Sequence, residues 1–326
     1  MKVVRITLTT LLIMVLASIA PAALTQVTFP ARTIRIIAPV PPGSPPDVVA
    51  RVIADQLSRD FGQPVIVENR PGANQTIGLG FVAAAAPDGY TLGMVSLPTA
   101  VVPSIVARMP FDTMRDLAPV REIAWTSNVL VVNNTSDIGS VRDLIAKAKA
   151  QPGRVTFASG GNGTPAHVIA ELFRDTAGID LLHVPFKGAV EGVAALVGGH
   201  VDLMFASAGA VEGQVRAGKL KALAQTTATR LPGFKDVPTL IELGFTQVAV
   251  RDWQGIVAPA GTPAVVLNRL STAIGQALLR QETQDRLRSL ALYAVDDSDP
   301  HTFGQFMESE LRRWAAVAKT ANLQAE

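Results

Sequence analysis

The chain of 326 residues contains no cysteine. It therefore has no disulfide bond, no thiolate metal ligand, no cysteine nucleophile and no lipid-modified cysteine behind an export leader. Runs of basic residues are missing as well, and the 29 Lys and Arg are nearly balanced by 27 Asp and Glu. No basic residues alternate with aromatic ones. These absences predict that nucleic acid is not a partner of this protein.

Motifs of catalysis are also scarce. No G-K-[ST] is present, which excludes a P-loop, and no G-x-S-x-G is present, which leaves a hydrolase elbow without support. His167 and Glu171 stand four residues apart on a predicted helix and could share a metal ion, but no third ligand follows at a suitable spacing. The shortage of acid–base pairs predicts a protein that is not an enzyme, with no cofactor and no metal.

Residues 1–22 have the pattern of a cleaved secretory signal. Lys2 and Arg5 supply the positive start, Ile6 to Ala20 the apolar segment, and Ala20-Pro21-Ala22 the cleavage site. A membrane anchor is the alternative, but the apolar run is shorter than the roughly 20 residues that a spanning helix needs. We expect cleavage near Ala22 and a soluble mature protein in a bacterial periplasm.

The stretch around residues 155–167 predicts a strand, a glycine loop and a helix in succession. Val155 to Ala158 forms the short apolar strand, Thr164 is placed to cap the helix, and Pro165 is its first residue. Backbone N–H groups and the positive end of the helix dipole would face the crevice after the strand, which suits an anion. The alternatives are a turn without a ligand and a weak dinucleotide fingerprint, G-x-G-x-x-A, whose acidic partner Asp180 precedes the required strand.

A second stretch repeats this pattern near the start of the chain. A strand over Thr33 to Pro39 leads through a Pro/Gly loop into a helix capped by Ser44, with Asp47 at its third position. An acid at this position is either a cap partner or a ligand contact. A further strand, Tyr90 to Ser96, ends in Ser96-Leu97-Pro98-Thr99, which could also face a cleft.

Strands and helices alternate along the chain, which predicts an α/β fold with mostly parallel sheets. The two loops, at Gly43 and Gly161, suggest two similar domains that face each other. In open α/β sheets a ligand lies beyond the carboxyl ends of the strands, where these loops stand.

The chain resembles one known family from about Arg35 to Pro263: the Bug/TctC-type substrate-binding proteins of tripartite tricarboxylate transporters. The resemblance rests on many short motifs in the same order. They are Phe29-Pro30, Pro42-Gly43 with Asp47 and Arg51, Val67-Glu68-Asn69-Arg70-Pro71-Gly72-Ala73, Ala86-Pro87-Asp88-Gly89-Tyr90, Pro110-Phe111-Asp112, Asp116-Leu117-Ala118-Pro119, Gly163-Thr164-Pro165 with His167, His183-Val184-Pro185-Phe186-Lys187-Gly188, Ala217-Gly218-Lys219, Asp236-Val237-Pro238-Thr239 and Ala258-Pro259-Ala260-Gly261-Thr262-Pro263.

The resemblance implies two α/β lobes with a ligand cleft between them, a two-lobed fold like that of periplasmic binding proteins. The chain would cross between the lobes near Trp125 and Arg251, so that residues 23–125 and 251–326 form one domain and residues 126–250 the other. A small organic carboxylate would be held by backbone N–H groups and water, and the partners would be membrane subunits of the transporter. We expect a monomer whose ligand-binding residues are Pro42, Gly43, Ser44, Asp47, Ser96, Thr99, Ser159, Gly161, Asn162, Gly163, Thr164, His167, Ala206 and Ser207.

The sequence departs from the family pattern at several cleft positions. In the first loop the family usually has an aromatic residue at position 40, glycine at 44 and small or hydroxyl residues at 45 and 46, where this chain has Val40, Ser44, Pro45 and Pro46. Further along, the family often has Asn at position 102 and Asp at 206, where this chain has Val102 and Ala206. Because two prolines remove two backbone donors from one helix start, the sequence predicts a monocarboxylate with an apolar or aromatic body. The alternative is that water replaces the missing donors around an ordinary dicarboxylate.

For the whole protein, a periplasmic sensor that signals to a membrane kinase is the second hypothesis, and a nucleotide-dependent enzyme is the third.

Overall fold

The computed structural model describes residues 29–320, so the predicted signal at residues 1–22 lies outside the described residues. Short runs rich in β-branched and aliphatic residues form the strands. These strands are β1 (Ile34–Ala38), β2 (Val65–Asn69), β3 (Thr91–Ser96), β4 (Leu117–Asn133), β5 (Thr156–Ser159), β6 (Leu182–Pro185), β7 (Leu203–Ser207), β8 (Leu220–Gln225), β9 (Arg251–Pro259) and β10 (Tyr293–Ala294).

Amphipathic segments between the strands form helices. The helices are α2 (Pro45–Phe61), α3 (Thr76–Ala83), α4 (Leu97–Ile105), α5 (Thr113–Asp116), α6 (Val141–Ala150), α7 (Pro165–Ala177), α8 (Ala189–Val197), α9 (Ala208–Arg216), α10 (Ala264–Leu278), α11 (Gln281–Arg288) and α12 (Pro300–Thr320). Short 3₁₀ turns are η1 (Ala73–Gln75), η2 (Pro232–Phe234) and η3 (Thr246–Val248). Within the described residues, no helix combines the length and apolar character needed to cross a membrane.

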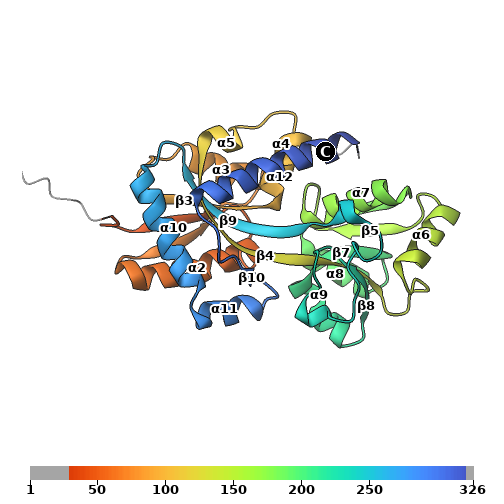
Figure 1. Cartoon of the computed structure of the whole chain (residues 1–326). Coiled ribbons are helices and arrows are strands. Elements are labelled where there is room, and N and C mark those ends of the chain that lie inside the picture. The colour runs from red at the N-terminus through yellow and green to blue at the C-terminus, as the bar shows by residue number, and fades with distance from the viewer. Residues whose placement is uncertain (1–28, 321–326) are drawn as a thin grey trace, which may run out of the picture. The chain divides into compact units, whose positions relative to one another are not determined.

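The strands follow the order β2-β1-β3-β9-β4-β7-β5-β6, with β8 and β10 paired to β4. At one end β2, β1 and β3 are parallel, and at the other end β7, β5 and β6 are parallel. The long strands β4 and β9 run antiparallel to their neighbours between these groups (Figure 1). The α/β class is thus confirmed, but the prediction of mostly parallel sheets is wrong, because every pairing of β4 and β9 is antiparallel.

Strand β4 divides the sheet into two halves that repeat one plan. It pairs with β9 up to Ser127 and with β7 and β8 from Asn128 onward. In the first half β9 pairs antiparallel with β3, which belongs to a group of parallel strands. In the second half β4 pairs antiparallel with β7, which also belongs to a parallel group. Two lobes of similar topology therefore share the crossing strands β4 and β9.

Most predicted elements agree with the structure to within a few residues. The helix starts at Pro45 and Pro165 are confirmed. At the start of α6 the Ser140 hydroxyl accepts from the Asp143 N–H. Two elements differ. The stretch after Ser96 is helix α4, and the apolar run from Val129 to Asn133, which predicts a strand, is only the second part of β4, which begins at Leu117. Polar residues such as Arg121 and Thr126 interrupt the apolar run of β4 and concealed its length.

Candidate functional site

The loop between β5 and α7 is held together by hydrogen bonds among its own residues. The buried Ser159 hydroxyl accepts from the Gly161 N–H at 3.0 Å and lies 2.6 Å from His183 Nε2. The Gly163 N–H donates to His167 Nδ1 at 3.2 Å. The N–H groups of Gly161 and Gly163 are therefore used inside the protein and are not among the free backbone donors expected at this loop.

Other donors of this loop remain open. The N–H groups of Asn162, Ala166 and His167 make no hydrogen bond to another residue in the described range 29–320. The last two belong to the first turn of α7, where no carbonyl of the helix can reach them. Pro165 occupies the first helical position, and the Thr164 side chain donates to the Gly161 carbonyl at 2.7 Å instead of capping the helix. The start of α7 thus offers backbone donors and a positive dipole end.

Behind this loop three rings stack in a row. The His183 ring lies 4.7 Å from the Phe157 ring and 4.4 Å from the His167 ring, measured between centroids. Burial, followed by the charges of His183 and Arg174, lowers the pKa of His167 to about 4. The imidazole is neutral at pH 7, and because Nδ1 accepts from Gly163 its proton is assigned to Nε2. His167 is predicted as a ligand contact, and in the structure its Nδ1 is used by the Gly163 N–H of the same loop.

The loop before α2 already contains a carboxylate. Asp47 is 1% exposed and accepts from the Gly43 N–H at 2.8 Å, from Arg51 at 2.9 and 3.1 Å, and from Asn69 at 2.7 Å. Burial alone would raise the pKa of Asp47, but the hydrogen bonds from Arg51, Gly43 and Asn69 outweigh it and lower the pKa. Asp47 is a partner of its own loop, which was one of the two sequence alternatives.

The start of α2 therefore differs from the start of α7. Pro45 and Pro46 occupy its first two positions and have no N–H, so the Asp47 N–H is its first donor. Ser44 stands at the cap position, but its hydroxyl donates to the Pro41 carbonyl at 2.8 Å and caps nothing. Pro42 and Gly43 are exposed.

Ser96 and Thr99 form a capping box at the start of α4, and sequence reasoning missed their third partner, Gln75. Gln75 Nε2 donates to Ser96 Oγ at 3.0 Å, and Thr99 Oγ1 donates to Gln75 Oε1 at 3.3 Å. In the sequence, Gly72 indicates a turn just before Gln75. It does not indicate that the Gln75 side chain points toward Ser96 and Thr99.

The loops of the two lobes approach each other at Gly163. A methyl group built on Gly163 would lie 3.2 Å from Ile105 Cδ1 and 3.6 Å from Asn74 Nδ2. Ile105 and Asn74 belong to the first lobe, whereas Gly163 belongs to the second. A side chain at position 163 would hold these surfaces apart, and its backbone also has a φ of +75°.

The remaining predicted residues lie on β7. Ser207 precedes α9 and pairs with Asn128 of β4, next to the crossing region. Ala206 is 1% exposed and packs in the apolar core of the second lobe, and Val102 is buried to the same extent in α4. The structure thus places these two side chains inside the lobes and not at an open rim.

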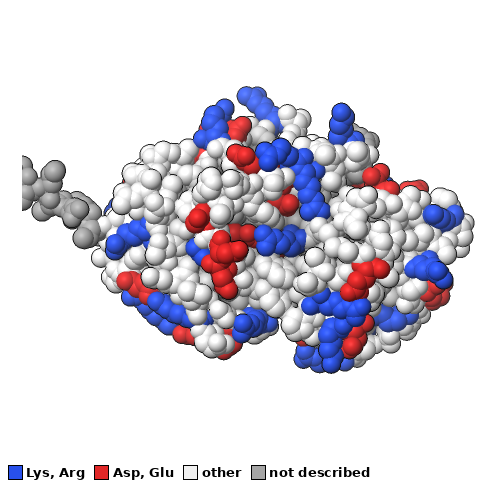
Figure 2. Space-filling view, viewed as in Figure 1, with Lys and Arg blue, Asp and Glu red and all other residues white. Residues whose placement is uncertain are grey.

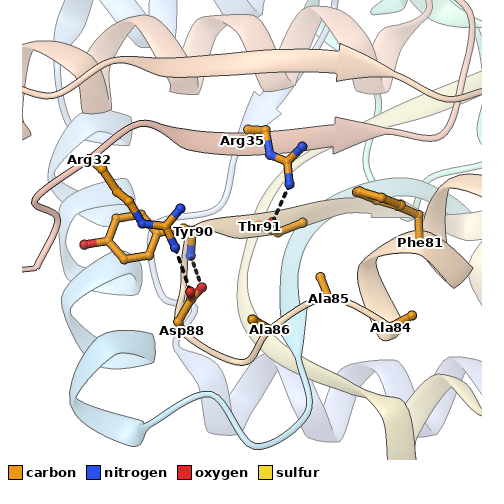
Figure 3. Close-up of a pocket in the computed structure, with 9 residues that line it drawn as sticks. All are labelled: Arg32, Arg35, Phe81, Ala84, Ala85, Ala86, Asp88, Tyr90 and Thr91. Carbon is orange, nitrogen blue, oxygen red and sulfur yellow. Dashed lines mark hydrogen bonds and ion pairs between the residues drawn. The ribbon is translucent and has the colours of Figure 1, made fainter.

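A separate hollow of about 280 Å³ lies in the first lobe (Figure 3). Its wall contains Arg35 and Thr91, near the amino ends of β1 and β3, whereas the loops described above follow the carboxyl ends of strands. Arg32 stacks on the Tyr90 ring at 3.9 Å and donates to Asp88 at 2.8 Å. These contacts secure the turn before β3.

Within the described residues the side chains form no metal centre. No group of three His, Asp or Glu side chains in residues 29–320 is placed to hold a metal ion. Glu171, the possible partner of His167, forms an ion pair with Arg174 at 2.8 Å. On the face in Figure 2, acidic and basic side chains are interspersed.

Two lobes of α/β topology, joined by crossing strands and facing each other through loops at the carboxyl ends of their strands, define a two-lobed solute-binding protein. The chain belongs to the TctC family, described as the tripartite tricarboxylate transporter family receptor, whose model matches residues 49–323. The family resemblance seen in the sequence is confirmed.

Individual relatives agree with this assignment. BugT of Bordetella pertussis is 37% identical over 294 residues, which cover 90% of each chain. A solved structure of R. palustris Rpa4515 with adipate superposes with a TM-score of 0.83 at 30% identity, covering 91% of this chain and all of the other. MatC of Rhodopseudomonas palustris with bound malate gives a TM-score of 0.78 at 30% identity, covering 89% and 99%. These relatives are solute-binding proteins and not enzymes, and members of the family are periplasmic binding proteins.

Proposed function

We propose that this protein captures a small organic carboxylate in the periplasm and delivers it to the membrane subunits of a tripartite tricarboxylate-type transporter. The observation that carries the proposal is the open start of α7, where the N–H groups of Ala166 and His167 have no partner among the described residues. Such a helix start binds anions. The adipate and malate bound to the two relatives are both carboxylates.

The proposal includes the export and domain organisation expected from the sequence: cleavage near Ala22, a monomer, and one lobe made of residues 23–125 and 251–326 with the other made of residues 126–250. The exchange of β4 partners between Ser127 and Asn128 supports these boundaries. The cleft between the lobes would include the ligand-binding residues expected in the Gly43 and Gly161 loops.

The carboxylate lies nearer α7 than α2 in this proposal. The start of α2 has two prolines without N–H groups, and the Asp47 carboxylate already accepts the Gly43 N–H of its loop. Ile105, an apolar side chain, stands opposite Gly163. We therefore propose a monocarboxylate with an apolar or aromatic body, and not a short dicarboxylate.

A thermal-shift panel tests this choice. The panel contains malate, succinate and adipate on one side and benzoate, phenylacetate and isovalerate on the other. A ligand at about 100 times its Kd stabilises the folded protein by roughly 2.7 kcal/mol, which is easily measured as a rise in Tm. We expect shifts with monocarboxylates. Stabilisation by the dicarboxylates alone would refute the preference, and no shift with any acid, after removal of bound molecules by unfolding and refolding, would count against the proposed function.

A further inference from the structure

The turn between β2 and α3 holds three consecutive residues other than glycine in left-handed backbone. Ala73, Asn74 and Gln75 have φ angles of 43°, 52° and 76°. Glycine is the ordinary occupant of such positions, because a Cβ crowds the backbone there, and Asn tolerates them better than Ala or Gln. Strained backbone of this kind gathers at binding sites, so the side chains that the turn presents require an explanation.

Gln75 fixes the turn to the start of α4. Its side chain is 9% exposed and is bonded to Ser96 and Thr99, as described above. Its N–H donates to the Gly72 carbonyl at 3.0 Å. The side chain of Gln75 thus has a role inside the first lobe, and it holds the preceding residue in place.

Asn74 has no such role inside the protein. Its half-buried carboxamide makes no hydrogen bond with any residue in the described range. It faces the other lobe, because its Nδ2 would lie 3.6 Å from a methyl group on Gly163. Gly163 directly precedes Thr164 and the first turn of α7, where the open N–H groups of Ala166 and His167 stand.

We propose that Asn74 is a ligand-binding residue, donated by the first lobe to the carboxylate that lies at the start of α7, and that Gln75 positions it. The inference rests on the proposed function, since it needs an anion at that helix. The Nδ2–H groups of an amide donate to a carboxylate, and hydrogen bonds to a charged group are the stronger class. The carboxylate would then touch both lobes, so its binding would favour their contact.

Calorimetry on three variants tests this role, with the acid that gives the largest shift in the panel above as the probe. Asn74→Gly removes the amide and suits the left-handed backbone, and Asn74→Asp keeps the shape but replaces the donor by a carboxylate. Ala73→Gly is the matched control, because it relaxes the neighbouring left-handed residue without removing a polar group. Melting curves show that each variant is folded.

We expect Asn74→Gly to raise Kd at least tenfold, which corresponds to about 1.4 kcal/mol, and Asn74→Asp to raise it further. Ala73→Gly should leave Kd within about twofold of the wild-type value. Wild-type affinity in folded Asn74→Gly, with an acid that the wild type binds, would overturn this inference and leave the proposed function intact. If no acid binds the wild type, both proposals fall.

Discussion

At the scale of single residues, the loop before α7 depends on a buried neutral histidine. His167 accepts the Gly163 N–H through Nδ1 and stacks on His183, and it is only 7% exposed. A proton on Nδ1 would break the hydrogen bond and place a charge among the rings. The folded protein therefore excludes that proton at physiological pH.

This burial predicts a pH dependence that His167→Asn should remove. Because burial lowers the pKa of His167 to about 4 from an ordinary value of 6.5, the unfolded state binds the proton more readily. The stabilisation is complete above pH 6.5 and is lost as the pH falls toward 4, by up to about 3 kcal/mol. The Asn amide oxygen can still accept from Gly163. Urea unfolding between pH 4 and 7 should show the wild type losing more stability than the variant on acidification; parallel curves would contradict the assignment.

A second buried residue, Asp252 on crossing strand β9, has a pKa that is raised, whereas that of His167 is lowered. Asp252 is 7% exposed, and its carboxylate makes no hydrogen bond within the described chain. Burial raises its pKa from 3.8 to about 7. Its proton therefore binds the folded state better than the unfolded state.

Asp252→Asn should consequently gain stability over the wild type as the pH rises. The wild type loses stability between about pH 4 and pH 7, because the carboxyl must ionise in a buried place, and the loss is on the order of 4 kcal/mol. The neutral amide avoids this loss. The difference in unfolding free energy should be small at pH 4 and largest at pH 8. A difference that is constant with pH would show that Asp252 does not titrate as described.

At the scale of elements, helices α2 and α7 follow similar loops but differ in what their starts can bind. Asp47 joins Gly43, Arg51 and Asn69 at the start of α2, and the start of α7 is open. The first helix start is thus occupied by the protein's own carboxylate. This contrast decides where an external carboxylate is expected.

Asp47→Asn should therefore destabilise the fold more than a similar change at another helix start. It removes a buried charge that neutralises Arg51, and losses of about 2–3 kcal/mol are typical for hydrogen bonds to charged groups. Asp143→Asn at the exposed start of α6 is the matched control, with an expected loss below about 1 kcal/mol. Urea midpoints of both variants measure the difference, and equal losses would deny Asp47 its structural role.

Much of the fold and part of the site could be predicted from the sequence, for identifiable reasons. The starts of α2 and α7 are marked by proline, and the glycine loop by residues that only a turn accommodates. Crossing strand β4 was predicted only from Val129, because its first part mixes polar and apolar residues. The roles of Gln75 and Asn74 depend on contacts with α4 and with the opposite lobe, which no local pattern encodes.

At the scale of the whole molecule, β4 and β9 connect two lobes whose loops meet at Gly163. Strand β10 pairs with β4 beside this connection, at Trp125 and Ala124. A molecule with this connection can open and close around the crossing strands, and a ligand that touches both loops would favour the closed form. We therefore expect carboxylate binding to close the lobes.

X-ray scattering tests whether a carboxylate closes the lobes. It compares the ligand-free protein with the protein that holds the strongest acid of the panel and with the protein in the corresponding primary amide. The amide has the same body but no charge for the start of α7 to bind. We expect a smaller radius of gyration with saturating acid and no change with the amide at the same concentration. An unchanged radius with bound acid, or equal closure with the amide, would contradict this expectation.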